Sequence, residues 1–332
     1  MGPISRLRIK NVLGLDVDLD FRSRPSQIVF VTGPPDSGKS RLMQALAAAL
    51  DFEDAGACSF DLINDYCQGS GRVVYGPDLK QGFVVKKPKH EYARQRHVSY
   101  KTVADWKKRA PVFFSAYDHE RHRIRSLGCG DFSATDRSAM RRGHPWHSGL
   151  WGVFDRLELL VHRSLEAEIA QMASRTLGYV IGMITRPEVW ESSSPVSFEK
   201  VIIGTGNPVF EINGKRESLV WGVDEHLDPR RRTVYPGVGL RRRRRVGLVL
   251  SLVLNLIDCY GIEGGPPNER PGVVLIDDQI EADLLRWLSE TFPKIQFFVS
   301  GVPDGWGGAE GAASSVIVEM KNGSAKFIRG KT

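Results

Sequence analysis

The sequence has few cysteines and no hydrophobic run long enough to cross a bilayer. Cys58, Cys67, Cys129 and Cys259 are its four cysteines, and no two of them have the C-x-x-C spacing of a zinc site. Scattered thiols of this kind fit a reducing cytoplasm. The most membrane-like stretch, residues 246–257, reads VGLVLSLVLNLI and falls short of the roughly 20 apolar residues that span a membrane. We therefore predict a buried core helix there and no membrane anchor.

A secretory signal and an internal repeat are also missing. The first residues, MGPISRLRIKNVLG, contain no apolar core of the kind that a signal peptide needs, so we expect a cytoplasmic protein. Positive charge is in excess, because the formal net charge is +7 and the pI is near 9.2. That balance favours contact with phosphates or acidic partners, although it does not name one.

Fully apolar segments alternate with helical segments along much of the chain. The predicted strands are 6–21 (as two strands), 28–32, 112–117, 198–221 (with a hairpin turn at Asn-Gly), 273–276, 295–300, and 316–320 with 325–328 (a final hairpin). The predicted helices are 40–50, 151–176, 240–260 and about 281–291. This alternation predicts an α/β fold with a mainly parallel sheet that is covered on both faces.

Residues 33–40 read GPPDSGKS, which has the spacing G-x-x-x-x-G-K-S of a phosphate-binding loop. Gly33 and Gly38 permit a tight turn whose backbone N–H groups surround a β-phosphate, and the helix that follows adds its positive end. Lys39 is expected to reach the β- and γ-phosphates, and Ser40 to place its hydroxyl on Mg²⁺. The residues predicted to bind the nucleotide are Gly33, Pro34, Pro35, Asp36, Ser37, Gly38, Lys39, Ser40 and Arg41.

A second motif ends the apolar run Val273–Ile276 with two acids, Asp277 and Asp278. A strand that delivers a carboxylate at its C-terminal end is the usual magnesium-side partner of a phosphate loop. We therefore predict that Asp277 holds Mg²⁺, directly or through water. Asp278 has the position of a general base that would activate the attacking water. Without the glycine loop, the two acids would be better explained as caps of the next turn.

Together these residues resemble the ABC-type P-loop ATPases of the SMC, RecF and OLD branch, and in particular its small bacterial AAA-type ATP-binding proteins. The resemblance starts at RLRIKNVLGLDVDLDF and the glycine loop and continues through PVFFSAYDHER. It is strongest over VGLVLSLVLNLI, GVVLIDDQIEADL and FPKIQFFVSGVP. It implies an ABC-type ATPase head that binds ATP and Mg²⁺. No heptad run is long enough for the coiled coil that SMC-type relatives insert.

Three positions depart from the family's pattern, and all three concern the γ-phosphate. Relatives have Asp-Glu where this chain has Asp277 and Asp278, and an aspartate is one methylene shorter, so it reaches less far toward the attacking water. Relatives have a histidine where Gly301 follows the third strand. Their signature Leu-Ser-x-Gly corresponds to YPGVGLRRRRRV, which keeps Gly237 or Gly239 and has no serine. The resemblance therefore implies a nucleotide binder with slow or absent hydrolysis, unless partner residues complete the site.

Eight arginines form two groups, Arg230–Arg232 and Arg241–Arg245. They are candidates for contact with a nucleic-acid backbone or an acidic partner. A charge run is equally typical of a solvated helix start, and five consecutive arginines on a helix cannot share one face. A third reading follows from the resemblance: an arginine here would replace the missing signature serine at the partner subunit's nucleotide.

Two histidine pairs have spacings that a metal could use, His119 with His122 and His144 with His147. No cysteine or carboxylate pattern completes a zinc site around them, so surface or core histidines are the better explanation. Trp306, in VPDGWGG, is either an exposed loop aromatic or part of the core.

The expected architecture is one ABC-type ATPase domain over residues 1–332. Its nucleotide-binding lobe comprises residues 1–50 and 240–332, and its variable, partly helical lobe residues 51–239. The expected function is an ATP-binding regulatory subunit that assembles as a nucleotide-dependent homodimer or with an effector protein. The resemblance implies bacterial antiviral defence or DNA maintenance. Two alternatives stay open: an active ATPase that acts on DNA through the arginines, and a scaffold that has lost nucleotide control.

Overall fold

The computed structural model describes residues 4–12, 14–22, 26–50, 69–75, 79–85, 98–100, 113–117, 145–166, 170–224, 233–260, 267–277, 279–306 and 314–328. Several residues named above lie outside these ranges: Asp278, Arg230–Arg232, His119, His122 and His144. The side chain of His147 also lies outside the described part of the chain. What the sequence predicts for these residues stays a prediction.

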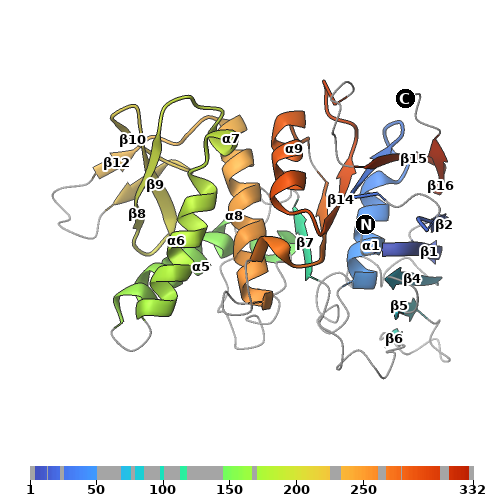
Figure 1. The fold of residues 1–332 in the computed structure, drawn as a ribbon. Coiled ribbons are helices and arrows are strands. Elements are labelled where there is room, and N and C mark those ends of the chain that lie inside the picture. Colours follow the sequence, from blue (N-terminus) through green and yellow to red (C-terminus); the bar gives the residue numbers. More distant parts are fainter. Residues whose placement is uncertain are drawn as a thin grey trace. The chain divides into compact units, whose positions relative to one another are not determined.

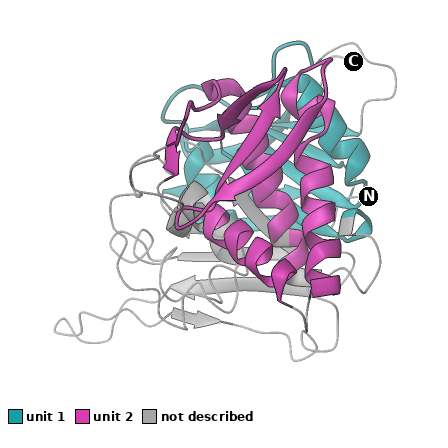
Figure 2. Ribbon diagram, turned by 90° about the vertical axis from the view of Figure 1, so that its left-hand side faces the viewer, with its two compact units in different colours: residues 1–116, 268–332 teal, residues 117–267 magenta. Residues whose placement is uncertain are grey.

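Contacts within the chain divide it into two compact units. One comprises residues 1–116 and 268–332, and the other residues 117–267; Figure 2 colours them separately. The two lobes expected from the sequence have other bounds, residues 1–50 with 240–332 and residues 51–239. They stay a prediction, because the units described here are defined by contacts and not by nucleotide binding.

In the described part of the chain, the first unit consists of one large sheet and two helices. Its strands are β1 (Ile4–Val12), β2 (Leu15–Asp20), β3 (Ile28–Thr32), β4 (Gly69–Tyr75), β5 (Leu79–Val85), β6 (Val98–Tyr100), β7 (Phe113–Tyr117), β13 (Gly272–Ile276), β14 (Ile295–Ser300), β15 (Ser315–Lys321) and β16 (Ser324–Ile328). The helices are α1 (Lys39–Leu50) and α9 (Ala282–Thr291). In the described part of the chain the strand order is β6-β5-β4-β1-β2-β16-β15-β3-β14-β13-β7 (Figure 1).

The centre of this sheet is parallel. Strand β3 pairs in parallel with β15 on one side and with β14 on the other, and β14 pairs in parallel with β13. Strands β3, β13 and β14 are mainly apolar and bury every residue except the last of β3 and of β14. Antiparallel strands extend one flank, where β1 lies between β2 and β4. The structure thus confirms the predicted α/β fold, whereas the sequence did not predict β4–β6.

Three strands of the parallel centre end at the same edge of the sheet. Val299 of β14 lies beside Ile276 at the end of β13, and Ser300 lies beside Val31 of β3. Because ligands of parallel α/β sheets bind beyond the carboxyl ends of the strands, this edge is where a site is expected. Residues far apart in the sequence meet there: the glycine loop after β3, Asp277 after β13 and Gly301 after β14.

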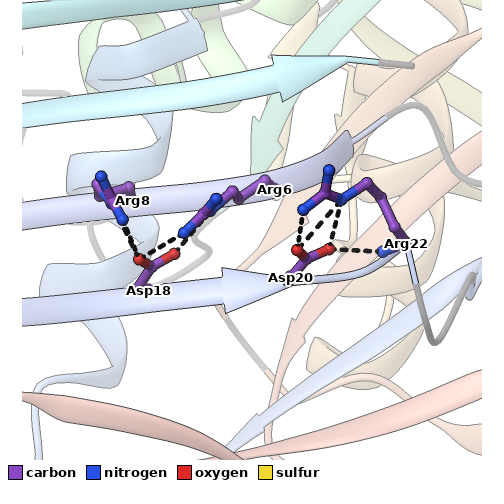
Figure 3. A network of polar contacts seen from close by, with 5 residues as sticks. All are labelled: Arg6, Arg8, Asp18, Asp20 and Arg22. Carbon is purple, nitrogen blue, oxygen red and sulfur yellow. Dashed lines mark hydrogen bonds and ion pairs between the residues drawn. The ribbon is translucent and has the colours of Figure 1, made fainter. Parts of the chain in front are cut away.

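Strands β1 and β2 carry opposite charges on their exposed face (Figure 3). The cross-strand partners are Arg6 with Asp20, Arg8 with Asp18, and Lys10 with Asp16. Asp18 pairs with Arg6 over 2.8 Å and with Arg8 over 2.6 Å, while Asp20 pairs with Arg22. The alternate residues of β2 are buried on the other face. A slip by one residue would bury the charges, so this pattern fixes the register of the two strands.

Among its described residues, the second unit combines helices with two small sheets. Its elements are α5 (Pro145–Leu165), α6 (Ala170–Ile184), α7 (Pro187–Trp190), β8 (Val196–Ile202), β9 (Asn207–Ile212), β10 (Lys215–Ser218), β11 (Gly222–Asp224), β12 (Thr233–Tyr235) and α8 (Leu240–Tyr260); a 3-10 turn, η2 (Pro267–Glu269), follows. Helices α5, α6 and α8 pack against one another (Figure 1). The prediction of one helix over 151–176 is wrong, because α5 ends at Leu165 and α6 begins at Ala170. No glycine or proline marks this break in the sequence, so the apolar periodicity continues through it.

Helix α8 is a core helix, as its apolar run predicts. Val246, Val249, Leu250, Val253 and Leu256 are all fully buried. Among the described residues, no helix is both long enough and apolar enough to cross a membrane.

Two hairpins turn on the dipeptide Asn-Gly, as predicted. Asn213 and Gly214 join β9 to β10 with φ values of 53° and 73°, and Asn322 and Gly323 join β15 to β16 with φ values of 49° and 78°. Positive φ at both central residues is the mark of a type I′ turn. The surroundings of the two turns differ: a side chain on Gly214 would meet open space, whereas one on Gly323 would overlap Gly14.

Trp306 belongs to the core of the first unit. It is 8% exposed, and its ring packs edge-on against Phe30 with the ring centroids 5.2 Å apart. The guanidinium of Arg286 lies over the Trp306 ring at 5.7 Å and donates a hydrogen bond to Gly305 O over 2.8 Å. The structure therefore decides for packing between the two explanations of this residue.

Candidate nucleotide-binding site

The loop between β3 and α1 takes positive φ at three positions, and the residues found there are types that tolerate it. Gly33, Asp36 and Gly38 take φ values of 143°, 59° and 102°. A Cβ on Gly33 would lie 2.5 Å from Met320 O and 2.6 Å from Ser37 Oγ, so only glycine fits there. Aspartate is one of the few other residues that visit the left-handed region. The two glycines predicted to shape the loop therefore do so.

The side chain of Lys39 folds back onto the backbone of its own loop. Its ammonium donates one hydrogen bond to Gly33 O over 2.8 Å and a second to Pro34 O over 2.9 Å. Helix α1 begins beside it, where Leu42 N–H donates to Gly38 O over 2.8 Å. An ammonium at the mouth of such a loop, beside a helix N-terminus, gives a site suited to an anion.

Asp277 connects the carboxyl ends of β13 and β14 to the first turn of α1. Ser40 Oγ donates a hydrogen bond to Asp277 Oδ1 over 3.2 Å, and Ser300 Oγ donates a second to the same oxygen over 2.6 Å. Two serines from different segments thus fix one carboxylate. Ser40 and Asp277, predicted separately as the magnesium-side pair, lie in direct contact.

Hydroxyl and carboxylate oxygens are the hard ligands that Mg²⁺ takes, usually from one or two protein groups together with water and phosphate oxygens. The pair of Ser40 and Asp277 fits such a site. A fuller protein cage is not present: the described residues include no group of three or more His, Cys, Asp or Glu that could hold a metal.

Ser300 is the residue of this arrangement that the sequence analysis missed. It is the last residue of the strand IQFFVS, which the sequence predicts as a strand without assigning a role to its serine. The available signal was its position, because a polar side chain at the carboxyl end of a central parallel strand faces the ligand edge of the sheet.

The other loop residues predicted to bind the nucleotide differ in their exposure to solvent. Pro34, Pro35 and Asp36 are exposed, whereas Ser37 is buried. Arg41 is exposed, and one of its guanidinium nitrogens lies 3.9 Å from the position that a Cβ on Gly14 would take.

Gly301 follows β14, at the position where the resemblance would place a histidine. Its φ is 85°, its N–H donates to Val31 O over 2.8 Å, and the space around a Cβ is open. This position has room for a side chain, but its backbone conformation strains every residue except glycine.

The five arginines at the start of α8 do not form one surface. Arg245 is 1% exposed, and its guanidinium donates to Val189 O over 3.1 Å, to Glu188 O and to the Glu191 carboxylate over 3.2 Å. Arg241 pairs with the same carboxylate. Helix periodicity brings these two to one side because they are four residues apart. Arg245 therefore anchors α7 to α8.

The segment before α8 contains Gly237 and Gly239. Gly237 is packed against backbone, since a Cβ there would lie 2.7 Å from Trp221 N, whereas a Cβ on Gly239 would meet open space. Val238 N–H donates to Ser218 O over 2.9 Å, which ties the segment to the end of β10.

No family model and no curated protein matches this sequence. Solved structures do match, at low identity and over nearly the whole chain. The structure of the recombination mediator protein RecF with ATP in the RecFOR pathway is 12% identical, covers 98% of this chain and 99% of that one, and gives a TM-score of 0.51. The SMC head bound to the C-winged helix domain of ScpA is 10% identical, covers 98% and 97%, and gives a TM-score of 0.53.

This chain has the fold of an ABC-type P-loop ATPase head. The fold expected from the resemblance is thereby confirmed.

Proposed function

We propose that this chain binds ATP with Mg²⁺ at residues 33–41 and acts as a regulatory ATPase subunit. The observation that carries the proposal is the contact of Ser40 with Asp277, whose same carboxylate oxygen also accepts a hydrogen bond from Ser300. A phosphate loop whose serine meets a strand-end carboxylate has the ligand set of a magnesium–nucleotide site. The choice of ATP is supported by the RecF structure, which was solved with ATP.

Each residue has a defined task in this proposal. The backbone N–H groups of the loop surround the β-phosphate, and Lys39 exchanges its two carbonyl partners for phosphate oxygens. Ser40 and Asp277 hold the metal, and Ser300 keeps the Asp277 carboxylate turned toward Ser40. When bound, Mg²⁺ neutralises charge on the phosphate oxygens.

We expect hydrolysis to be slow or absent. Asp278 is the candidate base, and its side chain is one methylene shorter than the glutamate that relatives use. Gly301 has no side chain to reach the γ-phosphate. The groups that would hold the β-phosphate and the metal are present, whereas those that would attack or sense the γ-phosphate are reduced.

We further propose that ATP favours a homodimer or a complex with an effector protein, in bacterial antiviral defence or DNA maintenance. The SMC head was solved with a bound domain of ScpA, and RecF is a recombination mediator, which supports this class of role.

A second candidate function is an active ATPase that acts on DNA through the arginines. Arg242, Arg243 and Arg244 are half-buried and would have to provide the contact on α8, because Arg241 and Arg245 share Glu191. DNA binding that falls steeply with salt and is lost in Arg242→Ala/Arg243→Ala would favour this candidate. Unchanged binding by that variant would remove it. The third reading, a scaffold without nucleotide control, is opposed by the intact Lys39 and Ser40.

The experiment that tests the leading proposal is calorimetric titration of the protein with ATP, with and without Mg²⁺, followed by light scattering of the complex. The proposal predicts binding that Mg²⁺ strengthens and a mass that rises with ATP or with a co-purifying partner. Absence of binding under both conditions would overturn it.

A further inference from the structure

Two turns of the first unit lie against the glycine loop. One is Gly14–Leu15 at the start of β2, and the other is Asn322–Gly323 between β15 and β16. The turns are joined to each other, since Asp16 N–H donates to Gly323 O over 2.9 Å. A Cβ on Gly323 would overlap the carbonyl oxygen of Gly14, so this close approach requires glycine.

The hairpin of β15 and β16 contacts the backbone of the glycine loop at two points. Gly323 N–H donates to Ser37 O over 3.4 Å. Met320 O lies 2.5 Å from the position that a Cβ on Gly33 would take. The hairpin therefore restricts both the entry of the loop and the residue just before Gly38.

Side chains complete the contact on Gly38. A Cβ there would lie 3.1 Å from Leu15 Cδ2 and 3.7 Å from Met320 Cε, and both Leu15 and Met320 are buried. We name the group Gly14, Leu15, Met320 and Gly323 the hairpin clamp. Three loop residues, Gly33, Ser37 and Gly38, touch it.

The loop needs an external restraint of this kind. Gly33 and Gly38 have many conformations open to them in a free loop, and the φ of 59° at Asp36 is sparsely populated for a residue with a side chain. The surroundings must therefore select this one loop conformation. A loop that is competent for only part of the time binds its ligand more weakly in the same proportion.

We propose that the hairpin clamp holds the glycine loop in its phosphate-binding conformation, and that Gly323 is a positioning residue of the site. This inference rests on the proposed binding of a nucleotide by the loop. Gly323 does not touch the nucleotide in this account; it acts through Ser37 and Gly33.

The chain supplies a matched control for the test. Gly323→Ala and Gly214→Ala place the same methyl group in the same type of turn, with φ values of 78° and 73°, and only Gly323 has a neighbour in the way. Both variants lose stability through the strained φ. With Mg–ATP as titrant, Gly323→Ala should raise the Kd by about tenfold or more, and Gly214→Ala should leave it within about twofold. Equal affinities for the two variants, both near wild type, would overturn the clamp.

A measurement on the wild type covers the case in which Gly323→Ala does not fold. Amide hydrogen exchange reports local opening. On adding Mg–ATP, the Gly323 N–H should gain protection together with the Gly38 N–H, while the Gly214 N–H stays unchanged. Protection at Gly38 without any at Gly323 would contradict the clamp and leave nucleotide binding intact. Failure of wild type to bind Mg–ATP would instead contradict the proposed function itself.

Discussion

Ser300 donates a 2.6 Å hydrogen bond to the same Asp277 oxygen that accepts from Ser40. The two serines lie 260 positions apart in the chain and come from different elements, since Ser300 ends β14 and Ser40 lies in the first turn of α1. One oxygen of Asp277 thus has two hydroxyl donors. These two hydrogen bonds set the orientation of the carboxylate.

Ser300→Ala should weaken binding of ATP in the presence of Mg²⁺ and leave metal-free binding unchanged. Groups that orient a metal ligand typically contribute about 10- to 100-fold to metal affinity. We expect the Kd for Mg–ATP to rise by about tenfold at the lower end of that range. Titration calorimetry with and without Mg²⁺ measures both values.

Ser289→Ala is the matched control for that variant. Ser289 is a buried serine of the same unit, and its hydroxyl donates to Arg286 O over 2.8 Å. Its loss should leave the Kd for Mg–ATP as it is. If the two variants weaken Mg–ATP binding alike, Ser300 has no special role at the carboxylate.

Arg245→Ala should destabilise the second unit strongly, whereas Arg241→Ala should not. Removing the buried guanidinium leaves Val189 O and Glu188 O without their donor, while Glu191 keeps its pair with Arg241, and a buried polar group left unsatisfied typically costs about 1–3 kcal/mol. The side chain of Arg241 is 61% exposed, so its pair with Glu191 contributes about 1 kcal/mol at most. Denaturant unfolding of both variants measures the difference, and equal losses would refute the structural role of Arg245.

Lowering the pH should remove the contribution that the charges on β1 and β2 make to the stability of the folded state. The hydrogen bond from Arg22 lowers the pKa of Asp20 to about 2, and that from Arg6 lowers the pKa of Asp18 from its ordinary value. A carboxyl whose pKa is lower when folded stabilises the native state above its unfolded pKa, near 4, and loses that contribution as the pH falls through the folded pKa.

The measurement is the Tm of wild type and of Asp18→Asn/Asp20→Asn, compared between about pH 6 and pH 2. The gap between them should be constant above about pH 5 and should close toward pH 2. It should also shrink in high salt, because these charges are exposed. A gap that persists at pH 2 would show that the two aspartates act through something other than their charge.

Asp278→Glu should increase steady-state hydrolysis of ATP without changing its Kd. The added methylene extends the carboxylate toward the attacking water, and rate depends steeply on such placement. Wild type is expected to bind with little turnover, so a phosphate-release assay has a low baseline. If wild type turns over rapidly and Asp278→Ala stops it, the aspartate suffices as base and the chain is a working ATPase.

Local patterns predicted the parts of the site that are continuous in the chain. The loop of residues 33–40 follows from spacing, and Asp277 from its place after an apolar strand. Ser300 could not be predicted this way, because a serine after an apolar strand is common and its partner is set by strand order. The contact of Gly323 with Ser37 likewise depends on β16 joining β2 and β15.

Charge and periodicity were poorer guides in the second unit. The run Arg241–Arg245 left its role open, and only the packing of α7 against α8 reveals that Arg245 is buried. The break between α5 and α6 carries no glycine or proline, so the helical period concealed it.

The proposed function depends above all on Lys39 and the loop around it, which we expect to bind a nucleotide's phosphates. The most direct test is titration of wild type, Lys39→Ala and Lys326→Ala with Mg–ATP, since Lys326 is an exposed lysine of the same unit that pairs with Glu319. We expect wild type and Lys326→Ala to bind Mg–ATP with the same affinity. Lys39→Ala should lose Mg–ATP binding while it stays folded. Undiminished affinity in Lys39→Ala would contradict the assignment of the loop.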